Sequence, residues 1–407
     1  MLTRRIFLRD SAVVMAGAGS APFWLGRAAA GTQAKRKTLV VIFQRGAADG
    51  LNIVVPFAEK RYYELRPSIG IPAPGGSGGM GGPPAIDLDG RFALNSGLQP
   101  LKPIWERQML AVVEATGSPD PTRSHFDAQD YMESGTPGFK RDGWLNRALP
   151  AAGTDRSPLR AIAMSASVPR TLQGDRSAIA VHDVKQFQAS DNSAAIIESM
   201  YANSPDKPLA AAGKDAFAAM RLLQSLGRTP YNPSGGAQYM QGGELGRSLQ
   251  QIAQLIKADA GVEAAFAEVG GWDHHQNETG QLNSLLRQFG SALAAFCTDM
   301  GDRMEDIVVV TMSEFGRTAQ ENGNNGTDHG HGGVMFVLGG PVRGGKVYGK
   351  WPGLEKEQLY EGRDLAVTTD FRDVLGELVA GHLGNTDLAQ VFPGYQATGS
   401  LGLLKEA

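Results

Sequence analysis

The octapeptide GTDHGHGG at residues 326–333 carries Asp328, His329 and His331 within four positions and surrounds them with glycine. Glycine has no side chain and adopts backbone conformations closed to other residues, so these imidazole and carboxylate groups can converge on a small ligand. A metal ion is the first candidate for that ligand. A polar turn with solvated histidines explains the same eight residues equally well.

Four further polar clusters each follow an apolar run. They comprise Arg45, Asp49 and Asn52 after TLVVIF; Thr122, Ser124, His125 and Asp127 after MLAVVEA; Asp273, His274 and His275 after VEAAFAEV; and Ser313, Glu314 and Arg317 after DIVVVTM. Five of the seven histidines lie in these clusters or in the octapeptide, which favours one shared site over scattered surface residues.

The apolar runs themselves predict the fold. Six short runs rich in β-branched residues begin at Thr38, Met109, Leu159, Val262, Asp306 and Val334, and helical patterns separate most of them. Such runs lack polar alternation, so they predict strands of an open, largely parallel α/β sheet sandwiched by helices. Residues 31–407 are expected to form a single domain, with the Ala-, Ser- and Gln-rich residues 185–258 as a helical excursion or cap.

The carboxyl ends of parallel strands meet at one edge of a sheet, so clusters far apart in sequence can share a cleft there. Imidazole combined with carboxylate suits zinc, manganese or iron better than magnesium or calcium. We therefore predict one or two divalent ions, zinc or manganese. The candidate ligands are the carboxylates of Asp49, Asp273, Glu314 and Asp328 and the imidazoles of His125, His274, His275, His329 and His331. Taken singly, each cluster is explained as well by a capped turn, a solvated turn or a local ion pair.

The N-terminus predicts export. In TRRIFLRD, Arg4 and Arg5 precede an apolar stretch that ends in GRAAAG, and this pattern is typical of a twin-arginine signal peptide cleaved near Ala30. The alternative, an uncleaved anchor, needs about 20 apolar residues to span a bilayer, and this stretch is shorter. The sequence thus predicts a periplasmic or exported protein that engages the twin-arginine translocase.

Composition excludes other classes of function. A formal net charge of −3 and the lack of a long basic block argue against nucleic acid as a partner. No G-x-G-x-x-G run follows the first predicted strand, so a dinucleotide-dependent oxidoreductase is not favoured.

Five segments resemble an exported bacterial family known as domain of unknown function 1501: RGAADGLNIVVPF, TRSHFDAQDYMESGTPG, GGWDHHQN, SEFGRTAQENGNNGTDHGHGG and LGGPVRGGKVYGKWPGL. This family is similar in turn to the alkaline phosphatase and sulfatase superfamily, whose members use one or two metal ions and a Ser, Thr or formylglycine nucleophile on an α/β sandwich. The resemblance implies that fold and a metal-dependent hydrolase of phosphate or sulfate esters.

By position, the resemblance makes Asp49 the early metal aspartate and places the nucleophile between Thr122 and His125. Asp273 and His275 match one metal site, Glu314 matches the acid of a second, and His329 or His331 matches the late histidine. Two departures stand out. Phe315 replaces the histidine that usually follows the second-site acid, and no C-x-P-S-R signature for formylglycine is present.

The mechanism implied uses a metal ion to activate the hydroxyl of Ser124 or Thr122, with Arg45 or Arg317 neutralising charge on the ester oxygens. A weaker variant activates Ser124 by His125 without a metal. The expected substrate is a small-molecule or glycan ester. The alternative is a non-catalytic exported binding or surface-assembly protein that keeps the fold with a degraded site, and Phe315 supports it.

Overall fold

A computed structural model gives the fold. It describes residues 36–136, 138, 142–150, 157–184, 198–203, 205–227 and 230–406. The predicted signal peptide and residues 185–197 of the predicted helical excursion lie outside these residues. Residues Lys37–Ala407 cluster into one compact unit. Among the described helices, none is long and apolar enough to cross a membrane.

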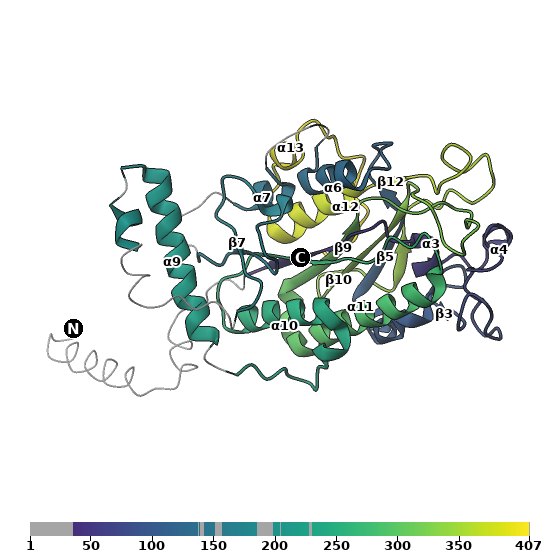
Figure 1. Cartoon of the computed structure of the whole chain (residues 1–407), viewed down its shortest axis with the longest axis horizontal. Helices are drawn as coiled ribbons and strands as arrows, with labels where there is room; N and C mark the ends of the chain where they lie inside the picture. The colour runs from purple at the N-terminus through teal and green to yellow at the C-terminus, as the bar shows by residue number, and fades with distance from the viewer. Residues whose placement is uncertain are drawn as a thin grey trace, which may run out of the picture. The chain divides into compact units, whose positions relative to one another are not determined.

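The main sheet contains all six strands predicted from the apolar runs. Three of them, β5, β9 and β10, are labelled in Figure 1, with helices on either side. Its strand order is β11-β5-β10-β9-β1-β8-β6-β7, and the short β12 also pairs with β5. The bounds are β1 Thr38–Gln44, β5 Leu110–Gly117, β6 Ala161–Ala163, β7 Ile179–Ala180, β8 Ala264–Val269, β9 Ile307–Ser313, β10 Gly333–Gly339, β11 Lys346–Tyr348 and β12 Thr369–Asp370. A smaller sheet joins β2 (Val54–Val55), β4 (Ala93–Leu94) and β3 (Ile86–Asp87).

Strand direction is largely parallel, as predicted, with one exception. β1 runs parallel to both β8 and β9, whereas β10 runs antiparallel to both of its neighbours, β5 and β9. A strand buried on both faces has the same apolar composition in either direction, so the sequence could not reveal this reversal. Because β10 is reversed, its first residue lies at the edge where β9 ends, and residues 314–332 become a connection along that edge.

Helices cover both faces of the sheet. Along β1, Leu39, Val41 and Phe43 belong to one hydrophobic core and Val40 and Ile42 to another, as the period of two in a strand requires. The second core packs against α10 (Gly243–Lys257) and α11 (Glu278–Met300). The first packs against α6 (His125–Ser134), α7 (Trp144–Ala148), α12 (Phe371–Leu378) and α13 (Leu388–Val391). The arrangement is the predicted open α/β sandwich.

Further helices complete the fold. They are α3 (Gly50–Ile53), α4 (Lys60–Leu65), α5 (Lys102–Glu106) and α9 (Lys207–Gly227). Within the predicted helical excursion, Leu249 and Ile252 of α10 and Leu223 of α9 lie in the same core as Val40. α10 therefore forms part of the layer that covers the sheet.

One buried group in β5 is unusual. Glu114 is 1% exposed, and neither of its carboxyl oxygens has a well-formed hydrogen bond within the described residues. Burial raises the pKa of Glu114 well above its ordinary value of 4.5, and the adjacent Ala115 amide offsets this only in part. The carboxyl is therefore protonated in the folded chain at a pH where the unfolded chain ionises it.

The contribution of Glu114 to protein stability should consequently fall as the pH rises above 4.5, because folding must take up a proton at this carboxyl. Glu114→Gln removes this requirement while keeping the shape of the side chain. We expect the variant to unfold at higher urea concentration than the parent at pH 8, and at the same concentration near pH 4. Glu357→Gln, at an exposed glutamate, is the control and should not change this pH dependence. Equal urea midpoints for Glu114→Gln and the parent at pH 8 would contradict the assignment.

Candidate metal centre

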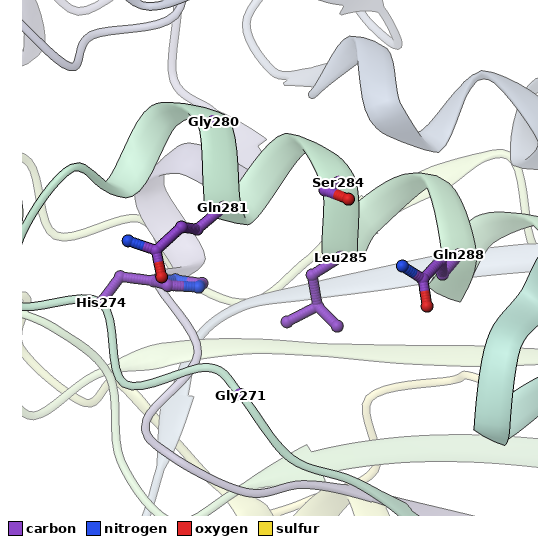
Figure 2. A pocket seen from close by; sticks show the side chains of 7 residues that line it. All are labelled: Gly271, His274, Gly280, Gln281, Ser284, Leu285 and Gln288. Carbon is purple, nitrogen blue, oxygen red and sulfur yellow. The ribbon is translucent and has the colours of Figure 1, made fainter.

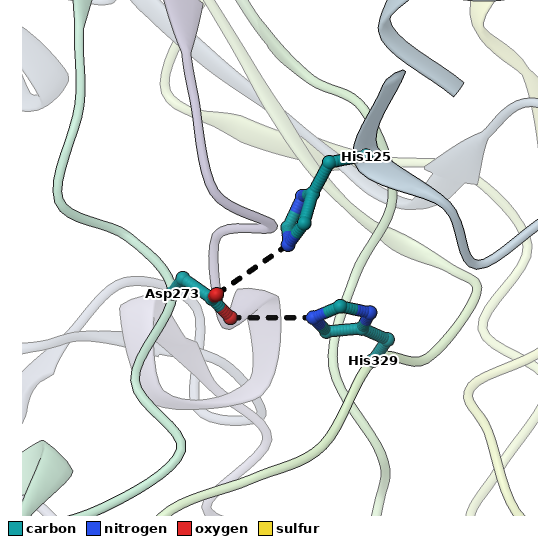
Figure 3. A group of neighbouring side chains, drawn as sticks. All are labelled: His125, Asp273 and His329. Atoms are coloured by element: carbon teal, nitrogen blue, oxygen red, sulfur yellow. Dashed lines mark ion pairs between the residues drawn. The ribbon is translucent and has the colours of Figure 1, made fainter. Parts of the chain in front are cut away.

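Three side chains from separate loops meet at the edge where β5, β8 and β9 end. His125 Nε2 lies 3.4 Å from Asp273 Oδ2, and His329 Nε2 lies 3.3 Å from Asp273 Oδ1 (Figure 3). One ligand atom from each of the three residues lies within 4.8 Å of the others, close enough to share an ion. His125 begins α6, Asp273 follows β8, and His329 lies between β9 and β10. The sheet topology brings these residues together.

His275 adds a fourth group. Its Nε2 lies 3.0 Å from Asp273 Oδ1 and 3.1 Å from His329 Nε2. In the D-H-H run at residues 273–275, the side chains of Asp273 and His275 therefore point toward His329, whereas that of His274 does not. His274 is 4% exposed and does not belong to this group.

Each of these three histidines is oriented through its other ring nitrogen. Nδ1 of His125 is 2.8 Å from Glu314 Oε1, Nδ1 of His275 is 3.1 Å from Asp328 Oδ1, and Nδ1 of His329 is 2.9 Å from the Arg123 carbonyl. An ionised carboxylate or a carbonyl only accepts hydrogen bonds, so each Nδ1 is the donor. In a neutral imidazole the lone pair is then on Nε2, the nitrogen that faces Asp273.

This arrangement fits a cation. Two Nε2 lone pairs 3.1 Å apart beside a carboxylate repel one another unless positive charge lies between them. His125 Nε2 is buried and has no hydrogen-bond partner among the described residues. Three imidazole nitrogens and one carboxylate match the number and type of ligands at a four-coordinate zinc ion, and a second partner on each imidazole is the usual companion of such ligands.

Asp273 is held by a buried cation. Arg317 Nη1 donates to Asp273 Oδ1 at 2.6 Å, while its Nε donates to Thr327 Oγ1 at 3.1 Å. Burial alone would raise the pKa of the Asp273 carboxyl, but the hydrogen bond and charge of Arg317 outweigh it, and the pKa lies below its ordinary value. Arg317 therefore keeps Asp273 ionised and in position.

Glu314 orients a ligand. Its Oε1 accepts from His125 Nδ1, from the Gly46 amide at 2.8 Å and from Gln129 Nε2 at 3.0 Å, and its Oε2 accepts from Ser313 Oγ at 3.1 Å. The side chain is fully buried. With both oxygens engaged, the structure places Glu314 behind His125, and Asp328 behind His275 in the same way.

Asp49 lies outside the group. Both of its oxygens pair with the buried guanidinium of Arg66, at 2.6 and 3.0 Å. Burial opposes ionisation of Asp49, but the charge of Arg66 holds its pKa below the ordinary value. Burial and the Asp49 charge raise the pKa of the neighbouring Glu278 well above its ordinary value. Arg66 and Glu278 were missed from the sequence, and no motif there marks them.

The two arginines predicted to be catalytic form hydrogen bonds with other side chains of the protein. Arg45 donates to Glu268 at 2.6 Å, to Gln129 at 2.9 Å and to Glu133 at 3.0 Å, and Arg317 holds Asp273 and Thr327. Both guanidinium groups therefore donate to acceptors of the protein itself.

The two predicted nucleophiles shape the turn before α6. Ser124 is the N-cap residue of this helix, and its Oγ accepts from the Asp127 amide at 3.5 Å. Thr122 Oγ1 accepts from the Ser124 amide at 3.2 Å. Ser124 directly precedes His125, so its hydroxyl is the nearer of the two to the histidine group along the chain.

His331 and Phe315 form the surroundings of the group. His331 is 6% exposed and stacks on Tyr360 with ring centroids 4.2 Å apart, and it does not join the other histidines. Phe315 stacks on His125 and tilts against His329, with ring centroids 5.1 Å away in both cases. An apolar ring therefore occupies the place where the superfamily resemblance expects a histidine.

The glycines of the opening octapeptide allow close approach of backbones. A Cβ atom at Gly326 would lie 2.4 Å from the His275 carbonyl carbon, and one at Gly330 would lie 2.3 Å from Arg317 backbone atoms. A Cβ atom at Gly316 would lie 1.8 Å from the Gly332 oxygen. The 314–332 connection is thus packed backbone against backbone beside the 273–275 loop.

The fold and this group define an open α/β protein with a cluster of histidines and an aspartate, spaced closely enough to hold a metal ion, at the carboxyl edge of its sheet. The chain belongs to the family described as protein of unknown function DUF1501, whose family model matches residues 108–393. No curated protein matches the sequence.

Three solved structures are similar to the chain at low identity and low TM-score. The chain is similar to an alkaline phosphatase from the Antarctic bacterium TAB5, with 10% identity, 76% of this chain and 93% of that chain covered, and a TM-score of 0.31. A protein in the alkaline phosphatase superfamily from Vibrio parahaemolyticus matches with 13% identity, 76% and 61% coverage and a TM-score of 0.26. A Pyrococcus horikoshii protein matches with 11% identity, 75% and 86% coverage and a TM-score of 0.29.

Proposed function

We propose that the protein is a periplasmic, metal-dependent hydrolase of phosphate or sulfate esters. The observation that carries the proposal is the convergence of three Nε2 atoms, each with its Nδ1 tied to an acceptor, on the carboxylate of Asp273. His125, His275, His329 and Asp273 would hold one zinc or manganese ion. When bound, such an ion polarises ester oxygens and lowers the pKa of a nearby hydroxyl.

The protein's own residues supply the remaining functions. Ser124 caps α6, and the amide groups at the start of a helix attract an anionic ester group. Its hydroxyl is the proposed nucleophile, because it lies one residue from His125. The hydroxyl oxygen would attack phosphorus or sulfur while the bond to the leaving alcohol breaks, and the hydroxyl proton would pass to that alcohol. Water would then hydrolyse the seryl ester, release phosphate or sulfate and regenerate the Ser124 hydroxyl. Phe315 excludes water from one side of His125.

One ion is proposed in preference to two. The residues expected for a second site are otherwise engaged: Asp49 by Arg66, and Glu314 by His125 and three other donors. The buried Arg66 guanidinium already supplies a positive charge beside Asp49.

The direct test measures metal and activity on the same samples. Protein purified without chelators should contain one zinc or manganese ion per chain by plasma mass spectrometry, and should hydrolyse a small aryl phosphate or an aryl sulfate. Ser124→Ala should abolish turnover with metal content unchanged, whereas Thr122→Val should retain both. A folded, active and metal-free protein would refute the metal-dependent mechanism.

A non-catalytic exported binding or surface-assembly protein is the second candidate, and the packing of Phe315 against two of the histidines favours it. Retained metal together with no hydrolysis of either ester, across zinc, manganese and magnesium, would support this candidate.

We also propose export by the twin-arginine pathway, from Arg4 and Arg5 in the sequence. Replacing both residues with lysine should leave the precursor in the cytoplasm, because the receptor of this pathway recognises the arginine pair. Cell fractionation of the producing bacterium measures this, and normal periplasmic recovery of the double variant would contradict it.

A further inference from the structure

A separate pocket lies beside the loop that carries two of the metal-ligating residues. It has a volume of about 480 Å³ and lies between the 271–274 loop and α11 (Figure 2). Its lining residues are Gly271, His274, Gly280, Gln281, Ser284, Leu285 and Gln288. None of His125, Asp273, His275 or His329 lines it, so the pocket is distinct from the metal centre. Its volume lies within the range of about 300–1,000 Å³ typical of small-molecule sites.

One wall of the pocket is a row of neutral polar side chains. Gln281, Ser284 and Gln288 follow one another at spacings of three and four residues, which places them on one face of α11. The Gln281 amide nitrogen donates to the Gln276 carbonyl at 2.7 Å, which fixes this side chain and leaves its oxygen as an acceptor. Within the described chain no hydrogen bond engages the Ser284 hydroxyl or the Gln288 amide, so both are available to a ligand.

His274 supplies a buried polar atom at the opposite wall. It is 4% exposed, and its Nδ1 has no hydrogen-bond partner among the described residues. Buried side-chain nitrogens are nearly always paired, and this one is unpaired within the described residues in a ring that lines the pocket. In Figure 2 the imidazole ring extends beneath Gln281, toward the space between the loop and the helix.

The pocket has room at its glycine positions. A Cβ atom at Gly271 or at Gly280 would meet no other atom within 4 Å. The backbone at these two positions is therefore open to a ligand, and the half-buried Leu285 provides an apolar surface between them.

The lining chemistry selects the ligand. No charged side chain lines the pocket, so a phosphate, carboxylate or ammonium group would find no counter-charge there. Two amides, one hydroxyl and one imidazole nitrogen both donate and accept hydrogen bonds, as vicinal hydroxyl groups require. A sugar ring presents such hydroxyls at its rim and C–H groups on its face, which suit Leu285.

We propose that this pocket binds a neutral saccharide. The site does not depend on ester hydrolysis at the metal centre, so it can exist whether or not the protein is an enzyme.

The test uses the full mature chain as purified, with maltose and chitobiose as probes. Saturation-transfer NMR should show binding of at least one of the two disaccharides, and calorimetry should give its Kd. The variant Ser284→Val/Gln288→Leu should bind about tenfold more weakly, since it loses hydrogen bonds to the ligand. The matched control Gln241→Leu changes an exposed glutamine outside the pocket and should bind as the parent does.

Two outcomes would overturn the proposal. One is that neither disaccharide binds to protein shown by circular dichroism to be folded. The other is that the double variant binds with the same Kd as the parent, which would place the sugar elsewhere. Both readouts are independent of turnover, so an inactive protein that binds sugar in this pocket would refute the proposed hydrolase and leave the saccharide site standing.

Discussion

The His329→Ala variant should lose its metal ion, and the His331→Ala variant should keep it. The two histidines are two residues apart, but only His329 presents Nε2 to Asp273, whereas His331 stacks on Tyr360. Removing a partner of a metal ligand typically weakens binding by about 10–100-fold, and removal of the ligand itself should exceed about 100-fold. Plasma mass spectrometry after dialysis against a weak chelator measures the difference.

Stability provides the second readout for this pair. His329→Ala should lower the unfolding temperature only relative to metal-loaded parent, because the ion stabilises the folded state by mass action. His331→Ala should lower it with or without metal, because the loss of packing reduces the free energy of unfolding by about 1–3 kcal/mol. If both variants retained the ion, or both lost it, the division of roles within the 326–333 octapeptide would be wrong.

Arg66→Met should be the most destabilising single change near the site. It leaves the Asp49 carboxylate buried without its partner, and breaking a buried ion pair in this way costs about 3–5 kcal/mol. Urea unfolding at pH 7 measures the loss. At a temperature where the variant remains folded, its metal content should equal that of the parent, because Asp49 and Arg66 lie outside the ligand group.

The double variant Asp49→Leu/Arg66→Met is the matched control. It removes both charges together, so it should recover much of the lost stability, as replacements of buried ion pairs by apolar residues often do. Asp49→Asn, tested in the folded state, should also retain the ion. Loss of metal from folded Asp49→Asn would show that Asp49 is a ligand after all and would reopen the case for a second ion.

The strands could be predicted because a strand buried on both faces is a continuous run of apolar residues in the sequence. Each of the six apolar runs became a strand of the main sheet. The reversed direction of β10 does not change its composition, and the short strands β7, β11 and β12 are only partly buried and belong to no apolar run. The direction of β10 and the formation of these short strands depend on the strands that lie beside them in the folded sheet.

The site was predictable to the level of its loops. The sequence placed His125, Asp273, His275 and His329 after strands at one edge, and the structure brings these four together. It could not separate ligands from the groups that orient them, because Glu314 and Asp328 have the same chemistry as Asp273. At Glu314 that distinction depends on which hydrogen-bond donors already occupy the carboxyl oxygens. At Asp49 it depends on the ion pair with Arg66, a residue that no motif connects to the site.

The backbone packing around Gly316, Gly326, Gly330 and Gly332 has a consequence for how such a chain can diversify. Main-chain atoms cannot rotate aside as side chains do, so a larger residue at any of these positions would displace the whole loop. Asp328 and His329 lie between Gly326 and Gly330, and their side chains are not confined by a neighbouring backbone in this way. Exchange of the residues displayed on this glycine frame, rather than of the glycines, is therefore the route by which new metal preferences or new chemistry would arise.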